Sequence, residues 1–357
     1  PAVLIETGFM SNSAELRKLV DSNFQAKSAR AIAKGVDRFL ATDPFTAVYP
    51  RIAGNNRYGT AVAIANSGWA STGGTAILAS GTNWPDALAG APLSKPLAAP
   101  LLLAEPDRLP DETRARLAAQ RPTHIVILGG ESAVSSATLT AAVAATGLQP
   151  SAVSVERLKG SNRYETATEV ARRMGLPASG RVFLASGRDF ADALSVGSYA
   201  GADGSPILLA DPDYLPGPTR EFLEEFAGMI TDIHVIGGPA AVGESVATQL
   251  ATFGTVTRVA GPDRYRTNLA VISRYGGTGA LAPYVASATS FPDALSAATL
   301  AAKNRRPVLL TGERYLPPYT REFLYNNRAR LADPTVVGGP AAVAYQTDWM
   351  IRKGFGR

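Results

Sequence analysis

Ten residues, Arg51-Ile52-Ala53-Gly54-Asn55-Asn56-Arg57-Tyr58-Gly59-Thr60, set a pattern that this chain repeats twice more. The second copy begins at Arg157 and the third at Arg258, and all three fit R-x-x-G-x-x-R-Y-x-T without a gap. Self-similarity at a fixed period is the sequence signature of repeated structural units. Because the period is roughly 100 residues, the size of a small domain, we expect three successive domains rather than the turns of a solenoid.

The same order of elements is predicted in every copy. In the first, short apolar strands at 48–52, 75–80, 100–104 and 124–128 alternate with helical segments, and a helix follows the last strand. Strands that are apolar throughout and alternate with helices are typical of a parallel sheet covered by helices. The segment that begins at Asp86 is rich in small residues, which favours a closely packed helix. The sequence therefore predicts an α/β fold of three parallel-sheet modules.

The bulk composition excludes some classes of site. The chain has no cysteine, so it forms neither disulfides nor thiolate metal sites. It contains no apolar run of about 18 residues, the length that would predict a membrane span. The formal net charge of +5 mildly favours anionic partners, although a charge of this size also serves solubility alone.

Residues 1–46 lie outside the repeats. We predict a short buried strand at 2–5, a helix that begins near Ser13, and a longer helix from about Phe24 to Leu40. One strand and two helices cannot form a core. We therefore expect this segment to be the tail of a domain whose body precedes Pro1, followed by a linker at Asp43-Pro44.

This segment resembles the C-terminal end of zinc-dependent N-acetylmuramoyl-L-alanine amidases, in the order strand, Glu6, Gly8-Phe9, Ser11-Asn12 and helix. The resemblance implies that Glu6 is the catalytic general acid/base beside a zinc-bound water, and that two histidines and a glutamate further upstream hold the zinc. The intact protein would then cleave the amide bond between MurNAc and L-Ala in peptidoglycan. The surface carboxylate of a strand end is the structural alternative for Glu6.

We expect no metal site and no amidase activity in residues 1–357. The only histidines are His124 and His234, each within an apolar run before a Gly-Gly pair. Neither has a histidine or cysteine at ligand spacing, so we interpret both as packed strand residues.

The three copies resemble the cell-wall-binding repeat 2 family of Gram-positive surface proteins, whose marks here are Arg-Tyr, Asp-Ala-Leu, Pro-x-Leu-Leu and Gly-Gly. The resemblance implies Rossmann- or Toprim-like modules around a pseudo-threefold axis. It also implies a secreted, extracellular protein held on the cell wall by an anionic secondary polymer such as a teichoic acid. We place the modules at 48–150, 151–255 and 256–357, after the amidase remnant and linker at 1–46.

Nine repeated residues are candidates for the polymer site. Three open the copies and are expected to be exposed at strand ends: Arg51, Arg157 and Arg258. Three precede the tyrosines: Arg57, Arg163 and Arg264. Three begin Asp-Ala-Leu: Asp86, Asp192 and Asp293. An arginine fork can grip phosphate or carboxylate. For the second arginine set, a salt bridge to the aspartate of the same repeat is the preferred interpretation, and the aspartates can equally be helix N-caps.

A nucleotide-binding α/β protein is the alternative function. It rests on the Gly-Gly pairs, which lie between a strand and a helix where backbone amides can hold a phosphate. The pairs lack G-x-G-x-x-G spacing and an acidic residue for the ribose, so the pattern supports this alternative weakly.

Overall fold

The computed structural model describes residues 11–41 and 46–355, with side chains described for 11–36 and 46–355. It divides into two compact units, residues 1–46 and 47–357. The described part of the first unit consists of α1 (Ser13–Leu19) and α2 (Ser22–Ala41), as the sequence predicts. The Asn12 side chain caps α1 by accepting from the amides of Ala14 and Glu15. The predicted strand at 2–5 and Glu6 lie outside the described residues.

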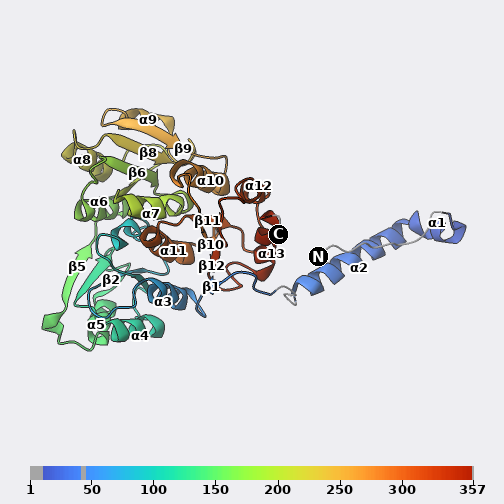
Figure 1. The fold of residues 1–357 in the computed structure, drawn as a ribbon, viewed down its shortest axis with the longest axis horizontal. Coiled ribbons are helices and arrows are strands. Elements are labelled where there is room, and N and C mark those ends of the chain that lie inside the picture. The colour runs from blue at the N-terminus through green and yellow to red at the C-terminus, as the bar shows by residue number, and fades with distance from the viewer. Residues whose placement is uncertain (1–10, 42–45, 356–357) are drawn as a thin grey trace. The chain divides into compact units, whose positions relative to one another are not determined.

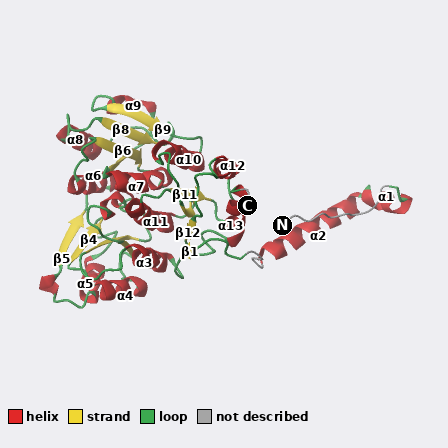
Figure 2. Ribbon diagram, in the orientation of Figure 1, coloured by secondary structure: helices red, strands yellow, loops and turns green. Residues whose placement is uncertain are grey.

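The second unit contains three four-stranded parallel sheets (Figures 1 and 2). Their strand orders are β3-β2-β4-β5, β7-β6-β8-β9 and β11-β10-β12-β1. The bounds are β1 (Arg51–Ile52), β2 (Thr75–Ser80), β3 (Leu101–Ala104), β4 (His124–Leu128), β5 (Ser154–Leu158), β6 (Arg181–Ser186), β7 (Ile207–Ala210), β8 (Asp232–Ile236), β9 (Thr255–Val259), β10 (Tyr284–Ser287), β11 (Val308–Thr311) and β12 (Thr335–Val337). The central strands are buried almost throughout, as solid apolar runs predict. The prediction of three α/β modules is therefore confirmed.

Helices separate and cover these strands. They are α3 (Arg57–Gly68), α4 (Asp111–Gln120), α5 (Ser136–Ala145), α6 (Arg163–Met174), α7 (Ala191–Asp203), α8 (Gly217–Glu225), α9 (Glu244–Leu250), α10 (Arg264–Tyr275), α11 (Phe291–Asn304), α12 (Pro318–Asn326) and α13 (Tyr345–Gly354). The polar residue before each Arg-Tyr pair starts a helix, because its side chain accepts from first-turn amides. These caps are Asn56, Asn162 and Asp263.

The opening strand of each repeat lies in the sheet of the neighbouring module. Strand β5 pairs with β4, and β9 pairs with β8. Strand β1, from the first repeat, pairs with β12 of the third, with Ile52 opposite Val337. The sequence boundaries proposed at 150 and 255 therefore assign the last strand of each of the first two sheets to the following module. The pairing of β1 with β12 also joins the first repeat directly to the third.

The Asp-Ala-Leu segments meet at the centre of the repeat unit, where α7 and α11 lie between the sheets (Figure 1). A Cβ added to Gly197 would lie 3.2 Å from the Ala298 Cβ and 3.6 Å from the Ala91 Cβ. Small residues therefore allow the close packing that the sequence predicts. The first copy departs from the predicted helix and forms two short 3₁₀ segments, Leu88–Gly90 and Pro92–Ser94. Pro92 lacks the amide hydrogen that a continuous α-helix requires there.

Candidate functional site

The aspartate of each Asp-Ala-Leu segment is packed against the first glycine of a Gly-Gly turn. A Cβ built on Gly129 would lie 2.6 Å from the Asp86 Oδ2, and the matching distance is 2.3 Å between Gly237 and Asp192. In the third module it is 2.4 Å between Gly338 and Asp293. These glycines have φ of 95°, 111° and 101°, so they are required both by conformation and by this close approach.

A threonine from the next repeat contacts the aspartate at the second and third junctions. The Thr267 hydroxyl accepts from the Gly261 amide at 3.1 Å and hydrogen-bonds the Asp192 carboxylate. At the third junction the hydroxyl of Thr60, from the first repeat, accepts from Gly54 at 3.2 Å and bonds Asp293. The Gly and Thr of R-x-x-G-x-x-R-Y-x-T therefore link successive modules around the unit.

Burial makes two of these carboxyl groups easier to protonate. It raises the pKa of Asp192 to about 7, with a further increase from the nearby Asp189 charge, opposed by Arg264 and by the Thr267 hydrogen bond. Burial also raises the pKa of Asp293 to about 6, opposed by the Thr60 hydrogen bond and by Arg57. These two junctions can therefore change charge near neutral pH.

The prediction that the opening arginines are exposed is wrong. The side chains of Arg51, Arg157 and Arg258 are only 11%, 14% and 21% exposed. Arg157 donates to the carbonyls of Gly129 and Val134, at 3.0 and 2.9 Å, and so holds the Gly-Gly turn of the preceding module. Arg258 donates to Gly237, at 2.9 Å.

Among the opening arginines, Arg51 has the most deeply buried carboxylate partner, Asp348. Arg51 donates to the carbonyls of Gly338 and Val343 and also to Asp348, at 2.9 and 3.1 Å. The Asp348 side chain is fully buried. The tertiary pairing of β1 with β12 brings these residues together, and the sequence pattern within one repeat does not reveal it.

The second arginine set also differs from its preferred interpretation. The side chains of Arg57, Arg163 and Arg264 donate to the carbonyls of Gly81, Gly187 and Ala288, respectively, at 2.6, 2.6 and 2.9 Å. No salt bridge to the aspartate of the same repeat is found among the described residues. Instead, each acts electrostatically on the aspartate of a neighbouring module: Arg264 on Asp192 of the second module, and Arg57 on Asp293 of the third.

The helix-cap alternative for the aspartates is also wrong where a full helix forms. The residue that precedes α7 is Phe190, and Asp192 lies inside the first turn. The residue that precedes α11 is Ser290, and Asp293 likewise lies inside the first turn. The tyrosines are packed, as expected, and bond within their own modules: Tyr164 donates to Asp211 at 3.2 Å, and the Tyr265 and Tyr315 hydroxyls lie 2.6 Å apart.

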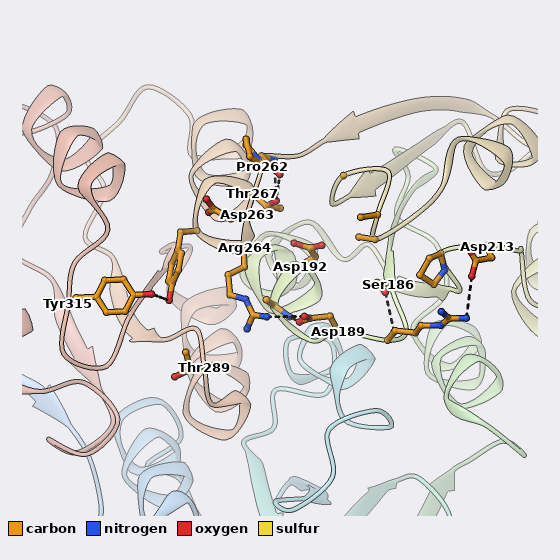
Figure 3. Close-up of a pocket in the computed structure, with 18 residues that line it drawn as sticks. Ser186, Asp189, Asp192, Asp213, Pro262, Asp263, Arg264, Thr267, Thr289 and Tyr315 are labelled. Atoms are coloured by element: carbon orange, nitrogen blue, oxygen red, sulfur yellow. Dashed lines mark hydrogen bonds and ion pairs between the residues drawn. The ribbon is translucent and has the colours of Figure 1, made fainter.

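A cleft of about 830 Å³ lies at the junction of the second and third modules (Figure 3). It opens where β6 and β8 end, against the N-terminus of α10. The carboxyl ends of parallel strands are the usual ligand site of open α/β sheets. Figure 3 shows Arg264 directed toward Asp189, and Tyr315 lies on the other side of Arg264 in this view. The ion pair between Arg264 and Asp189 measures 2.9 Å.

The cleft carries more carboxylates than guanidinium groups. Its lining contains Asp189, Asp192, Asp213 and Asp263, against Arg188 and Arg264. Arg188 is 57% exposed and pairs with Asp211 and Asp213 at 2.9 and 3.4 Å. Carboxylates, guanidinium groups and the half-exposed Tyr315 ring are groups that bind sugar hydroxyls and sugar faces.

Sequence reasoning missed Arg188, Asp189 and Tyr315, because none of them belongs to the repeated motif. One signal was available: Arg188 and Asp189 follow a buried strand after a single glycine, Gly187, at the carboxyl end where ligands bind in parallel sheets. For Tyr315 the signal was its place before the repeated Leu316-Pro317 pair, where the second repeat has Tyr214.

The histidines are packed, as the sequence predicts. The His234 Nδ1 lies 2.5 Å from the Tyr275 hydroxyl, and burial lowers the pKa of this imidazole. His124 lies 3.5 Å from Glu156. Within residues 11–41 and 46–355, no three His, Asp or Glu side chains are grouped so that they could hold a metal ion.

The chain matches cell wall binding domain 2 (CWB2) over residues 51–139, 157–247 and 258–348. Residues 1–38 match the N-acetylmuramoyl-L-alanine amidase family. The solved structures of Cwp6 and Cwp8 from Clostridium difficile both superpose with a TM-score of 0.74 at 27% identity. These matches cover 82% and 91% of this chain and 46% and 55% of theirs.

Two curated relatives come from Bacillus subtilis (strain 168). The N-acetylmuramoyl-L-alanine amidase LytC is 32% identical over 82% of this chain and 56% of its own length. An amidase enhancer is 31% identical over 78% of this chain and 37% of its own length. This chain therefore spans about half, or less, of the relatives it matches.

The repeat unit is a wall-binding array of α/β modules. The chain belongs to the cell wall binding domain 2 family, with three of its repeats after a short segment that matches the amidase family. These comparisons do not favour the nucleotide-binding alternative. The Gly-Gly turns also argue against phosphate binding, because the amide of the first glycine in each pair already donates to the opening strand of the next repeat. These hydrogen bonds run from Gly129 to Leu158, from Gly237 to Val259 and from Gly338 to Ile52. Among the described residues no helix has the length and apolar character to cross a membrane.

Proposed function

We propose that the three modules hold the protein on the outside of the cell wall by binding an anionic secondary polymer. The observation that supports this most directly is the cleft at the carboxyl ends of the second module's strands, in a family of cell-wall-binding repeats. We assign sugar units of the polymer to this cleft. Its carboxylates accept from sugar hydroxyls, while Arg188 and Arg264 donate to ring and anionic oxygens.

The nine repeated residues stay a prediction as polymer ligands. Their contacts support a structural role, in which they stabilise the junctions between modules. Direct contact then falls to less buried side chains of the cleft, above all Arg188, Asp189 and Tyr315. Because one exposed charge pair contributes little, several weak contacts on one rigid body must act together.

We further propose that the intact protein cleaves the amide bond between MurNAc and L-Ala in peptidoglycan, with Glu6 as general acid/base. This rests on the amidase match at residues 1–38. In that family a bound zinc would supply an activated water. The described residues do not fit a zinc site, because their His, Asp and Glu side chains form no group of three that could hold the metal. Glu6→Ala in the intact protein should lower turnover by about 10² or more.

A pelleting assay with the full chain tests the anchoring proposal. Purified Gram-positive walls should retain the chain, and walls stripped of anionic polymers should retain far less. Added salt should weaken retention, because it screens the attraction. Arg188→Ala should reduce retention, whereas Arg114→Ala, an exposed arginine of α4, is the matched control. Equal retention on stripped and whole walls would show that peptidoglycan is the ligand and would refute the proposal.

A further inference from the structure

A second cavity, of about 350 Å³, also lies at the junction of the second and third modules. The first cleft lies at the carboxyl ends of the strands, whereas this cavity lies at their amino ends. It is formed where β6 begins and where α7, α10 and α11 end. Its side chains belong to Arg181, Phe183, Tyr199, Asp203, Tyr275 and Arg305. None of these residues belongs to the repeated motif, and none of them lines the cleft described above.

Aromatic rings form one part of this cavity. The Tyr275 ring lies 5.5 Å from Phe183 and 5.7 Å from Tyr199, measured between centroids. The Tyr275 hydroxyl is held by His234, which fixes the ring in place. The negative face of an aromatic ring offers apolar contact to the C–H face of a sugar.

The charged residues of the cavity are two arginines and one aspartate, so its lining carries a net positive charge. Arg181 is partly neutralised by Asp203, at 3.3 Å. Arg274 and Arg330 add positive potential, since they act electrostatically on Tyr275 and Tyr199, respectively.

The most informative of these charges is that of Arg305. Within the described part of the chain, this exposed guanidinium has no hydrogen-bond or carboxylate partner. Arg330, in contrast, donates to the carbonyls of Gly276 and Gly277 and serves the end of α10.

Two of these side chains have no counterpart of the same type in the other repeats. Arg305 has φ of 53° at the C-cap of α11, a left-handed conformation that favours glycine. The matching residues of the other repeats are Gly204 and Ala98. Tyr199 likewise corresponds to Leu93 and Leu300. An arginine and a tyrosine therefore occupy positions that the fold fills elsewhere with small or aliphatic residues, which argues for a role in binding rather than in packing.

We infer that this cavity is a non-repeated anion site that binds one phosphate-bearing sugar unit of the wall polymer. Arg181 and Arg305 would hold the phosphate oxygens, and Tyr199 and Tyr275 would face the sugar ring. The volume lies within the range of small-molecule sites. The inference rests on the proposed anchoring function for the source of the ligand. It also adds attraction for anions to that of the cleft, where carboxylates outnumber the guanidinium groups.

Calorimetric titration of the full chain with glucose 1-phosphate and with glucose tests the site directly. The phosphate ester should bind, and unphosphorylated glucose should bind much more weakly at this site. Arg305→Gly should weaken glucose 1-phosphate binding by about tenfold, the loss expected for a charge-assisted contact. It should leave the fold intact, because Gly204 occupies the same position in the second repeat.

Arg121→Gly is the matched control, since Arg121 is also an exposed arginine at a left-handed helix end, with φ of 54°. It removes the same charge and should leave binding unchanged. Tyr199→Leu, which copies Leu93 and Leu300, should also weaken binding. No binding of glucose 1-phosphate by the wild-type chain, or equal losses in Arg305→Gly and Arg121→Gly, would overturn the site.

Wall retention separates this inference from the anchoring proposal. Arg305→Gly should lower retention on whole walls, and Arg121→Gly should not. Loss of glucose 1-phosphate binding with unchanged wall retention would overturn the assignment to the polymer and identify a free sugar phosphate as the ligand. Equal retention of the wild-type chain on stripped walls would refute anchoring by the polymer, while the calorimetric result would still decide whether the phosphate site exists.

Discussion

Asp192 lies so close to Gly237 that any side chain on this glycine would overlap the carboxylate, with only 2.3 Å between a Cβ and the Asp192 Oδ2. The contact joins Asp-Ala-Leu to the Gly-Gly turn, two motifs that are about 45 residues apart in a chain whose domains measure roughly 100. It explains why both motifs recur in every repeat. Their shared function is to build the junction on which the next module rests.

Gly237→Ala should therefore destabilise the protein more than an alanine at an unhindered glycine. Gly204 also has a positive φ, of 81°, but nothing lies within 4 Å of its Cβ position. Gly204→Ala should cost about 1 kcal/mol of unfolding free energy from backbone strain alone, and Gly237→Ala about 2–4 kcal/mol because overpacking adds to that strain. Urea unfolding of both variants measures the difference, and equal losses would contradict the close contact.

Stability should depend on pH through Asp192. Its pKa is raised to about 7, above the ordinary value of 3.8, so the folded state binds more protons than the unfolded state between these values. The contribution of this group therefore favours folding at low pH and is lost as pH rises through about 7. Asp192→Asn, which copies the neutral form, should be less sensitive to pH between 5 and 8, a window of roughly three units in which the wild-type group titrates.

Melting temperatures of the wild type and Asp192→Asn across this range provide the measurement. Asp263→Asn is a suitable control, because this carboxylate caps α10 and accepts from the Arg266 amide. It should lower the melting temperature without removing the pH dependence between 5 and 8. Parallel curves for the wild type and Asp192→Asn would show that Asp192 is already ionised at the low end of the range.

The opening arginines should contribute to stability, in an order set by their partners. Arg157→Ala leaves the carbonyls of Gly129 and Val134 without their donor, at a cost of about 1–3 kcal/mol. Arg51→Ala should cost more, about 3–5 kcal/mol, because it leaves the buried Asp348 carboxylate without its cation.

A second substitution checks this reasoning. Adding Asp348→Asn to Arg51→Ala should recover part of the lost unfolding free energy, since the uncompensated charge is removed. Chemical denaturation of the single and double variants gives the coupling. If Arg51→Ala and Arg157→Ala are equally destabilising, the buried carboxylate does not depend on Arg51.

Removal of β1 should weaken the third module selectively. The Val336 amide donates to Pro50 and the Gly338 amide to Ile52, both at 2.9 Å. Deletion of residues 46–52 in the full chain should increase hydrogen exchange at Val336 and Gly338, while the amides of β2 in the first sheet stay protected. Deletion of α1, Ser13–Leu19, is the length-matched control and should leave both sheets unchanged. Unchanged protection at Gly338 after loss of β1 would contradict the closure.

Much of the fold could be predicted because it depends on local patterns. Apolar runs such as Leu101–Ala104 become buried strands, and polar residues such as Asn162 start helices. The candidate site was harder to predict, because the sequence cannot show which exposed loop faces which neighbour. The guanidinium groups of Arg157 and Arg163 are of a type that binds ligands, yet in the structure they donate hydrogen bonds to the backbone carbonyls of Gly129 and Gly187. Arg188 and Arg305 lie outside the repeated pattern and were not predicted.

The sequence by itself determined that three similar α/β modules follow a segment that resembles an amidase, since element type and repeat period are encoded in short-range patterns. The tertiary structure alone decided where each module's sheet ends and which arginines remain available to a ligand. The physical reason is that strand pairing between β1 and β12, and the enclosure of Asp192 and Asp348, join residues from different repeats. Such contacts depend on how the modules close around one another, and no local pattern within a single repeat specifies them.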